Sequence, residues 1–442
     1  MMATSLRALL LLNVAHATAL TIAGYTFQTT AGQKYGTLDN QIAAMGNASR
    51  YADSAATLAA YEAVEQSSGR SIQSLIEEVV SKELASDEIA AYWGDARHAD
   101  AFVLAAITAT DAAASWDPIS RRELLLKGAA YQVVRQHIFA RLRAGVKSCN
   151  DRALANQTSG AIFEWEAAYA LHSGALELSN GTGKGWSTYA LADKRCPQFG
   201  TCIRGTHPAR SNVLALRAWE DGVHALSFGD CLGAMQSYRA IVAQLTVPLV
   251  QGMLREAYEV DPLHGRAAAD GVVEVAEGWA FTAAILPQVA LCNQSAASLI
   301  ERNMALSLDG SNGSHVADGF RVVKKAIEAE YPCLLITCID VGGMLTSGRP
   351  IQGFEPCTSD EALAPGNSGT TRVSTAGLVT FIIAAVLIAL DNLRMHRRER
   401  CQRMWSSKYG GASAEVITVK VSEGQQQSCS AAAYASNQSG VA

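Results

Sequence analysis

The feature that most constrains the fold is a long stretch of helical periodicity almost without proline. Between residues 35 and 146, Pro118 is the only proline, and apolar residues recur three or four positions apart. Asp117 before Pro118 is a typical helix start, with an N-cap residue followed by proline at the first helical position. Alternating strand patterns are scarce, and no strand–helix–strand pattern occurs. The sequence therefore predicts an all-α fold.

Two hydrophobic segments predict the topology. Residues 1–19 carry one early charge, an apolar run and small residues near Ala19, as in a secretory signal peptide. Residues 372–390 include an uncharged run long enough to span a bilayer core of about 30 Å. Arginines follow it at once, which indicates a transmembrane helix rather than a buried core helix and places the tail in the cytosol. We expect a single-pass plasma-membrane protein with its N-terminal domain outside and a basic, largely disordered tail over 391–442.

The external part is expected to contain two related helical-bundle lobes, residues 20–208 and 209–344. The acidic, aromatic stretches EWEAAY and EVAEGWAF each follow a long apolar helix, which suggests a degenerate internal repeat. The alternative is that two amphipathic helices share only their composition. Residues 345–371 are rich in Gly, Pro and Ser and are predicted to form a stalk before the membrane.

Cysteines and glycosylation sequons agree with an extracellular location. Eight of the ten cysteines lie between the two hydrophobic segments, and an even number is typical of an oxidising compartment. We expect two local bridges, Cys196–Cys202 and Cys333–Cys338, and leave the other pairings open. Five sequons in the same region begin at Asn47, Asn156, Asn180, Asn293 and Asn312.

Charge and motifs limit the function classes. The chain has 36 basic and 41 acidic residues, and the acidic excess lies between the hydrophobic segments. An acidic external domain gives no electrostatic footprint for nucleic acid, whereas it attracts cations. The metalloprotease pattern His-Glu-x-x-His and the hydrolase pattern Gly-x-Ser-x-Gly are absent from the sequence. We therefore expect a binding protein rather than an enzyme.

One predicted helix carries Glu166, Tyr169 and His172 three positions apart, so the three side chains share a face. A carboxylate, a phenol and an imidazole are donors that a ferric ion accepts. If the two lobes face each other, Glu274 and Glu277 of the second lobe complete a metal site in the cleft. The helix is expected to end at residues 180–183. The alternative is an amphipathic helix with a solvated polar face, followed by a disulfide-closed loop.

Three further residues are weaker metal candidates: Glu164, and the pair Glu220 and His224, which are four apart on a predicted helix. That pair is more often a surface contact. Lys194 and Arg195 are candidates for binding an anion such as carbonate, because an arginine fork matches a planar oxyanion. A stabilising contact within the loop is an equal alternative for these two residues.

Several long motifs resemble one protein family. They are GAIFEWEAAYALHSGALE, YALADKRCPQFGTC, QSYRAIVAQLTVPLVQGMLREAY and VVEVAEGWAFTAAILPQV. With weaker similarity upstream they span residues 35–339, and they resemble the algal low-iron-inducible periplasmic proteins, also called the iron-assimilation (Fea) family. Membrane-anchored diatom relatives are known as phytotransferrins. The resemblance implies an extracellular iron-assimilation protein and, for anchored members, ferric iron bound together with carbonate.

The resulting hypothesis is a cell-surface receptor that binds ferric iron outside the cell and supports its uptake. Its expected partners are the metal ion, the plasma membrane, and an iron transporter, a reductase or the endocytic machinery. The alternative is a structural or adhesive surface glycoprotein that carries no metal. An extracellular metal-dependent enzyme is a third possibility with little support from motifs.

Overall fold

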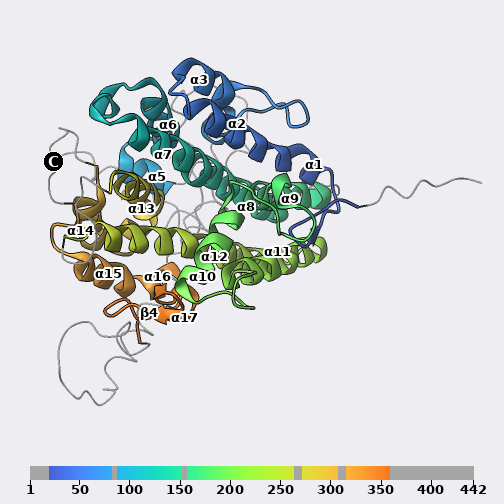
Figure 1. The fold of residues 1–442 in the computed structure, drawn as a ribbon. Helices are drawn as coiled ribbons and strands as arrows, with labels where there is room; N and C mark the ends of the chain where they lie inside the picture. The colour runs from blue at the N-terminus through green and yellow to red at the C-terminus, as the bar shows by residue number, and fades with distance from the viewer. Residues whose placement is uncertain (1–18, 82–86, 152–156, 263–270, 307–314, 359–442) are drawn as a thin grey trace, which may run out of the picture. The chain divides into compact units, whose positions relative to one another are not determined.

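The computed structural model describes residues 19–81, 87–151, 157–262, 271–306 and 315–358. These residues belong to one compact unit and are mostly helical, which confirms the predicted fold class (Figure 1). Residues 1–18 of the predicted signal peptide (1–19), the predicted transmembrane segment 372–390 and the predicted tail 391–442 lie outside the described residues.

The N-terminal half, blue to green in Figure 1, begins with a two-stranded hairpin and continues in helices. Its elements are β1 (Thr21–Ile22), β2 (Tyr25–Thr26), α1 (Ala31–Tyr35), η1 (Gly36–Leu38), α2 (Asp39–Ser49), α3 (Ser54–Glu62), α4 (Ile72–Ser81), α5 (Asp87–Trp93), α6 (His98–Thr108), η2 (Asp111–Ser115), α7 (Pro118–Gly128), the π-helical turn η3 (Ala129–Val133), α8 (Val134–Asn150), α9 (Gln157–Ser173) and η4 (Ala175–Glu177).

The C-terminal half contains the longest helices and ends in a second hairpin. Its elements are α10 (Thr188–Phe199), α11 (Arg210–Phe228), α12 (Cys231–Glu259), α13 (Val272–Cys292), α14 (Gln294–Met304), α15 (Phe320–Ala329), α16 (Tyr331–Leu334), α17 (Cys338–Val341), β3 (Leu345–Thr346) and β4 (Arg349–Pro350).

Local sequence signals explain several helix boundaries. The Asp117 carboxylate accepts hydrogen bonds from the backbone N–H groups of Ile119 and Ser120, so the predicted N-cap of α7 is confirmed. Helix α9 ends at Ser173, earlier than predicted, because Gly174 adopts a positive φ of 74° that the helix cannot contain.

Helix α13 lies at the centre of the fold, packed against α7, α12 and α14. It is long and apolar enough to cross a membrane, yet 78% of its apolar window is buried inside the protein. A helix that is apolar on all sides also suits the core of a large soluble unit. We therefore describe α13 as the central core helix.

The expected division into lobes at residue 208 is not confirmed. One hydrophobic core runs from Ile22 to Cys357, and both expected lobes contribute to it. Helices α8 and α9 of the first expected lobe also pack on α12 and α11 of the second. The bundle therefore has a continuous interior.

The first part of the predicted stalk belongs to this folded unit. Strands β3 and β4 pair, and Phe354 is buried against the rings of Phe320 and Tyr258. Cys357 forms a disulfide with Cys338. The prediction of a stalk from residue 345 is therefore wrong for residues 345–358, because an aromatic anchor and a disulfide outweigh the Gly- and Pro-rich composition.

All eight cysteines of the described part form disulfides. The predicted Cys196–Cys202 bridge is confirmed, whereas the predicted Cys333–Cys338 bridge is wrong. Cys333 instead meets the end of α13, because α16 packs against that helix. The four bridges are Cys149–Cys231, Cys196–Cys202, Cys292–Cys333 and Cys338–Cys357.

Candidate functional site

Glu166, the first predicted metal ligand, is fully buried and holds the N-terminal hairpin against α9. Its Oε1 accepts hydrogen bonds from the Tyr25 hydroxyl at 3.1 Å and the Gln28 N–H at 2.7 Å. Its Oε2 accepts from the N–H and hydroxyl of Thr29, at 2.8 and 2.5 Å. Four donors satisfy this carboxylate, so it acts as a structural anchor rather than an open metal ligand.

Tyr169 and His172 also point into the core. The Tyr169 hydroxyl donates to the Ala23 carbonyl at 2.9 Å, and burial raises the pKa of Tyr169 well above its usual value. The His172 ring stacks on Trp219 with centroids 4.9 Å apart, and burial lowers the pKa of His172 to about 3. The phenolate that iron would need is therefore disfavoured here.

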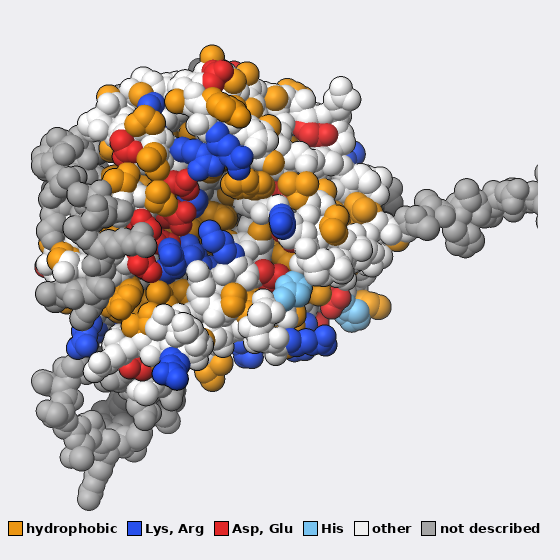
Figure 2. Space-filling view, viewed as in Figure 1, with side chains coloured by type: hydrophobic (Ala, Val, Ile, Leu, Met, Phe, Trp, Pro, Cys, Tyr) orange, Lys and Arg blue, Asp and Glu red, His pale blue; other side chains and the backbone are white. Residues whose placement is uncertain are grey.

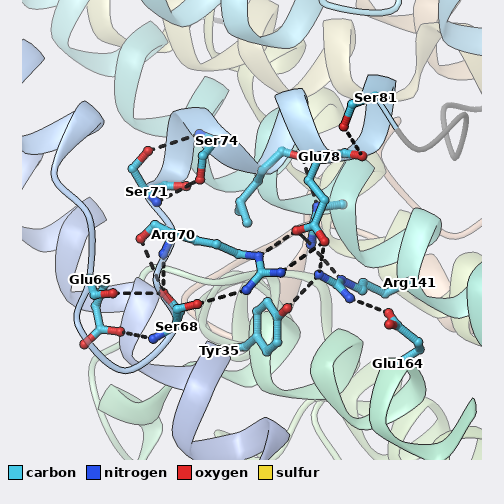
Figure 3. Close-up of polar contacts among 12 residues, drawn as sticks. Tyr35, Glu65, Ser68, Arg70, Ser71, Ser74, Glu78, Ser81, Arg141 and Glu164 are labelled. Atoms are coloured by element: carbon cyan, nitrogen blue, oxygen red, sulfur yellow. Dashed lines mark hydrogen bonds and ion pairs between the residues drawn. The ribbon is translucent and has the colours of Figure 1, made fainter. Parts of the chain in front are cut away.

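Glu164, a weaker candidate, belongs to a separate ion-pair network shown in Figure 3. Arg141 of α8 bridges Glu164 of α9 and Glu78 of α4, and also donates to the Tyr35 hydroxyl at 2.6 Å. Arg70 pairs with the same Glu78 through two nitrogens. The network joins elements that are distant in sequence and leaves no vacant set of ligands.

The second-lobe residues have other partners. Glu277 lies 2.9 Å from Lys127 and 3.4 Å from Arg195, and Glu274 stands in the first turn of the same helix α13. Glu220 and His224 are exposed on α11. In the part of the chain that the structure describes, no three His, Cys, Asp or Glu residues are grouped to hold a metal ion. The predicted set of five ligands is thus not assembled.

A pocket of 670 Å³ does bring charged groups together. It lies between the end of α7, the η3 turn, the loop 181–186 and α10, with Phe281 of α13 contributing to its wall. Figure 2 shows basic and acidic side chains gathered together over the middle of this face. The charged residues that line the pocket are Lys127, Glu177, Lys184, Asp193, Lys194 and His207.

Lys194, one of the two predicted anion-binding residues, lines this pocket. No ion pair of Lys194 occurs among the described residues, in contrast to Lys127, which pairs with Glu123 and Glu277. Partial burial lowers the pKa of Lys194, with Arg195 and Lys127 adding to the effect and Glu277 opposing it. A lysine that forms no ion pair and lies near other cations attracts an anion into the pocket.

Arg195, the other predicted anion-binding residue, is only 1% exposed and lies beneath the pocket. Its guanidinium contacts Glu256 at 2.9 Å and Gln198 at 3.0 Å, in addition to Glu277. Burial disfavours the charged form of Glu277, but Lys127 and Arg195 outweigh burial and hold the pKa of that carboxyl below its usual range. Arg195 therefore stabilises the base of the pocket instead of meeting a ligand directly.

His207 and Asp193 form a pair at the pocket wall. His207 Nδ1 lies 2.6 Å from Asp193 Oδ2, while Asp193 Oδ1 accepts from the Ala209 N–H at 2.7 Å and from the Asn212 side chain at 2.9 Å. With its proton on Nδ1, the imidazole keeps a lone pair on Nε2. A carboxylate that orients a histidine in this manner is typical of metal-binding histidines.

The loop 181–186 is held by two buried carboxylates. Glu177 accepts the Gly185 N–H at 2.8 Å, and Asp39 accepts the Trp186 N–H at 2.9 Å. Burial raises the pKa of Glu177 to about 7 and that of Asp39 to about 6, although each backbone donor opposes the shift. A side chain at Gly183 would collide with the Leu176 carbonyl, so this position requires glycine.

Four charged or titratable pocket residues were not predicted from the sequence: Lys127, Glu177, Asp193 and His207. Asp193 directly precedes the predicted Lys194 and Arg195, and that adjacency was the available signal. The segment 192–196, expected as part of a loop, belongs to helix α10, which turns Lys194 toward the pocket and Arg195 toward the core.

Two of the predicted glycosylation sites, Asn156 and Asn312, lie outside the described residues. Asn47 and Asn180 are exposed. Asn293 caps α14 with its side-chain oxygen, and its amide nitrogen donates to Glu330 at 2.9 Å. A glycan on Asn293 would replace one of the two hydrogens of this amide nitrogen, next to Glu330.

Comparisons with protein-family models, with curated proteins and with solved structures found no match to this chain.

Proposed function

We propose that this protein is an extracellular iron-assimilation protein that binds ferric iron together with a small oxyanion such as carbonate. The proposed site is the pocket between α7, α10 and the loop 181–186. The observation that carries the proposal is the position of the unpaired Lys194 in the same pocket as the oriented His207–Asp193 pair. A cation for the oxyanion and donors for the metal are thereby available together.

The oxyanion is assigned to Lys194, with Lys127 as its neighbour on α7. Lys127 pairs with Glu123 and Glu277, whereas Lys194 forms no ion pair among the described residues and is available to a ligand. Coulomb attraction inside a partly buried pocket is several times stronger than in bulk water. Carbonate, with two negative charges and three oxygens, would bridge the lysine and the metal.

The metal is assigned to His207 Nε2, with Asp193 orienting the ring. Glu177, at the end of η4, supplies a carboxylate to the same pocket, and its proton must leave before it binds a cation. Ferric iron prefers oxygen ligands and accepts imidazole nitrogen, so carbonate oxygens and water would complete its coordination. The proposed site thus has fewer protein ligands than the set of five that was predicted from the sequence.

The cellular setting of the proposal follows from the disulfides and from the sequence. Four bridges suit an oxidising extracellular compartment. We propose that residues 372–390 anchor the protein in the plasma membrane and that a transporter, a reductase or endocytosis carries the iron inward.

A pair of lysine variants tests the proposal. Lys194→Met removes the unpaired pocket cation, and Lys325→Met, at an exposed position on α15 outside the pocket, is the matched control. Purified full-length proteins are titrated with ferric nitrilotriacetate, with and without bicarbonate. We expect bicarbonate to strengthen iron binding by the wild type and by Lys325→Met, and to have at least tenfold less effect on Lys194→Met. Equal bicarbonate dependence of all three proteins would refute the assignment.

A further inference from the structure

A second, smaller cavity of 30 Å³ lies on the opposite side of the η3 turn, between α5, α6, α8 and α13. Tyr131 lines both this cavity and the larger pocket. π-helical turns inside α-helices are rare and frequently occur at functional sites. Several polar side chains next to η3 are buried without a full set of hydrogen-bond partners among the residues that the structure describes, which is unusual in a protein core.

Arg135, which lines the cavity, is a buried cation without an acidic partner within ion-pair distance in the described ranges. It is 5% exposed, and its partners are the neutral oxygens of Ala284 at 2.8 Å, Thr246 at 2.9 Å and Gln288 at 2.5 Å. Its Nε has no hydrogen-bond partner in the described part of the chain. An isolated charge in the interior is costly unless an opposite charge accompanies it.

The pKa of Arg135 also reflects a buried charge without an acidic partner in direct contact among the described residues. Burial lowers the pKa of Arg135 to about 9, and the Glu88 carboxylate, which also lines the cavity, opposes that shift without forming an ion pair. The ring of Phe139 faces the guanidinium at 4.5 Å and supplies a partial attraction only. Glu88 and Phe139 therefore offset part of the cost of burial, but no acidic side chain forms an ion pair with the guanidinium in the described ranges.

Three more polar atoms of the cavity lining lack partners among the described residues: Gln132 Nε2, Gln136 Oε1 and His98 Nε2. Gln132 and Gln136 are more than nine-tenths buried. The His98 ring stacks on Trp93 with centroids 3.9 Å apart, and burial lowers the pKa of His98 to about 4, so the ring is neutral. A neutral imidazole can carry its proton on Nε2 and act as a donor.

We propose that this cavity binds a small monovalent anion of the size of chloride, held by Arg135 Nε, Gln132 Nε2 and His98 Nε2. The cavity volume of 30 Å³ is at least twice the roughly 10–15 Å³ that one water molecule requires, which leaves room for an ion somewhat larger than water. Water alone would satisfy the three donors but would leave the guanidinium without a counter-ion in direct contact. Gln136 Oε1, which can only accept, is then available to a water molecule that accompanies the ion.

The anion would act as a structural ligand of the η3 turn, separate from the proposed iron site. Because it binds the folded chain and not the unfolded one, it stabilises the fold as its concentration rises. The test follows thermal unfolding of the iron-free, full-length protein while sodium chloride replaces sodium gluconate at constant ionic strength. Gluconate is too large for the cavity.

We expect the unfolding temperature of the wild type to rise by several degrees with a saturable dependence on chloride. Arg135→Met should abolish that rise. Arg217→Met, at an exposed arginine of α11, should retain it. Lys194→Met should retain it as well, because its lysine belongs to the other pocket. Equal unfolding temperatures in chloride and gluconate, or loss of the rise in Lys194→Met, would overturn the proposal.

A second variant covers the case in which Arg135→Met does not fold. Gln132→Leu keeps the Arg135 cation and removes one hydrogen-bond donor. The chloride concentration that gives half of the rise in unfolding temperature should therefore be at least tenfold higher than for the wild type. Crystals grown in bromide should show one anomalous peak beside Arg135 Nε. An unchanged chloride dependence in Gln132→Leu, or a bromide-free cavity, would refute the site.

Discussion

His207 Nδ1 lies 2.6 Å from Asp193 Oδ2, and the Cys196–Cys202 disulfide closes a short loop within the segment that joins these two residues. The bridge and the backbone hydrogen bond from Ile203 N–H to the Pro208 carbonyl return the chain to α10. This short, disulfide-containing segment thus places the oriented His207 imidazole at the wall of the pocket that Lys194 also lines.

This relationship predicts that His207 contributes to iron binding. Replacing His207 by Gln removes the Nε2 lone pair, and we expect iron affinity to fall at least tenfold, a loss of about 1.4 kcal/mol. Competition with a chelator measures the affinity. His224→Gln, at an exposed histidine on α11, serves as the control and should bind like the wild type. Equal affinities of both variants would exclude His207 as a ligand.

Glu166 is predicted to matter for stability and not for iron. Glu166→Gln weakens charge-assisted hydrogen bonds with Tyr25, Gln28 and Thr29, so the free energy of unfolding should fall by about 1.5–3 kcal/mol. Urea denaturation measures the change. Glu220→Gln, at an exposed carboxylate of α11, serves as the control and should change the free energy of unfolding little. A selective loss of iron binding in Glu166→Gln, without loss of stability, would restore the ligand set predicted from the sequence.

Glu177 is predicted to make stability depend on pH. Its folded pKa of about 7 exceeds the usual 4.5, so the folded state keeps a proton that the unfolded state loses between these pH values. Its contribution to the free energy of unfolding therefore falls as pH rises from 4.5 to 7 and is constant above that range.

Glu177→Gln removes this dependence. The difference in unfolding free energy between the variant and the wild type should grow by about 3 kcal/mol between pH 4 and pH 8. Denaturation at several pH values measures it, and the difference cancels contributions from other groups. A difference that does not vary with pH would show that Glu177 ionises normally.

The disulfides should differ in their contribution to stability. Cys149–Cys231 closes a segment of 82 residues and Cys196–Cys202 one of 6. When each cysteine pair is replaced by alanines, loop-closure entropy predicts that the free energy of unfolding falls by about 4.5 kcal/mol for Cys149–Cys231 and by about 2 kcal/mol for Cys196–Cys202. The short bridge should nevertheless affect iron binding more, since it positions His207. A larger loss of iron affinity on removal of Cys149–Cys231 than on removal of Cys196–Cys202 would contradict the role proposed for the segment between Asp193 and His207.

Sequence patterns predicted those features that depend on neighbouring residues. Helical periodicity gave the fold class, Asp117 before Pro118 marked the start of α7, and the closely spaced Cys196 and Cys202 form a bridge. Lys194 was identified as a possible anion ligand and lines the pocket. Each of these predictions depends on a few residues adjacent along the chain.

Long-range packing could not be predicted in the same way. A spacing of three residues predicts that Glu166 and Tyr169 lie on one face of α9. It does not predict whether that face meets solvent or the hairpin at Tyr25. Cys333 bonds to Cys292 because α16 packs on α13, a contact between distant segments. Phe354 joins the core despite a Gly- and Pro-rich neighbourhood, since three aromatic rings surround it.

The most direct test of the central claim is a titration of the purified full-length wild-type protein with ferric nitrilotriacetate, performed with and without bicarbonate. We predict saturable binding of one ferric ion per chain that requires bicarbonate. Absence of saturable iron binding in the presence of bicarbonate would contradict the account and would favour a surface glycoprotein without metal.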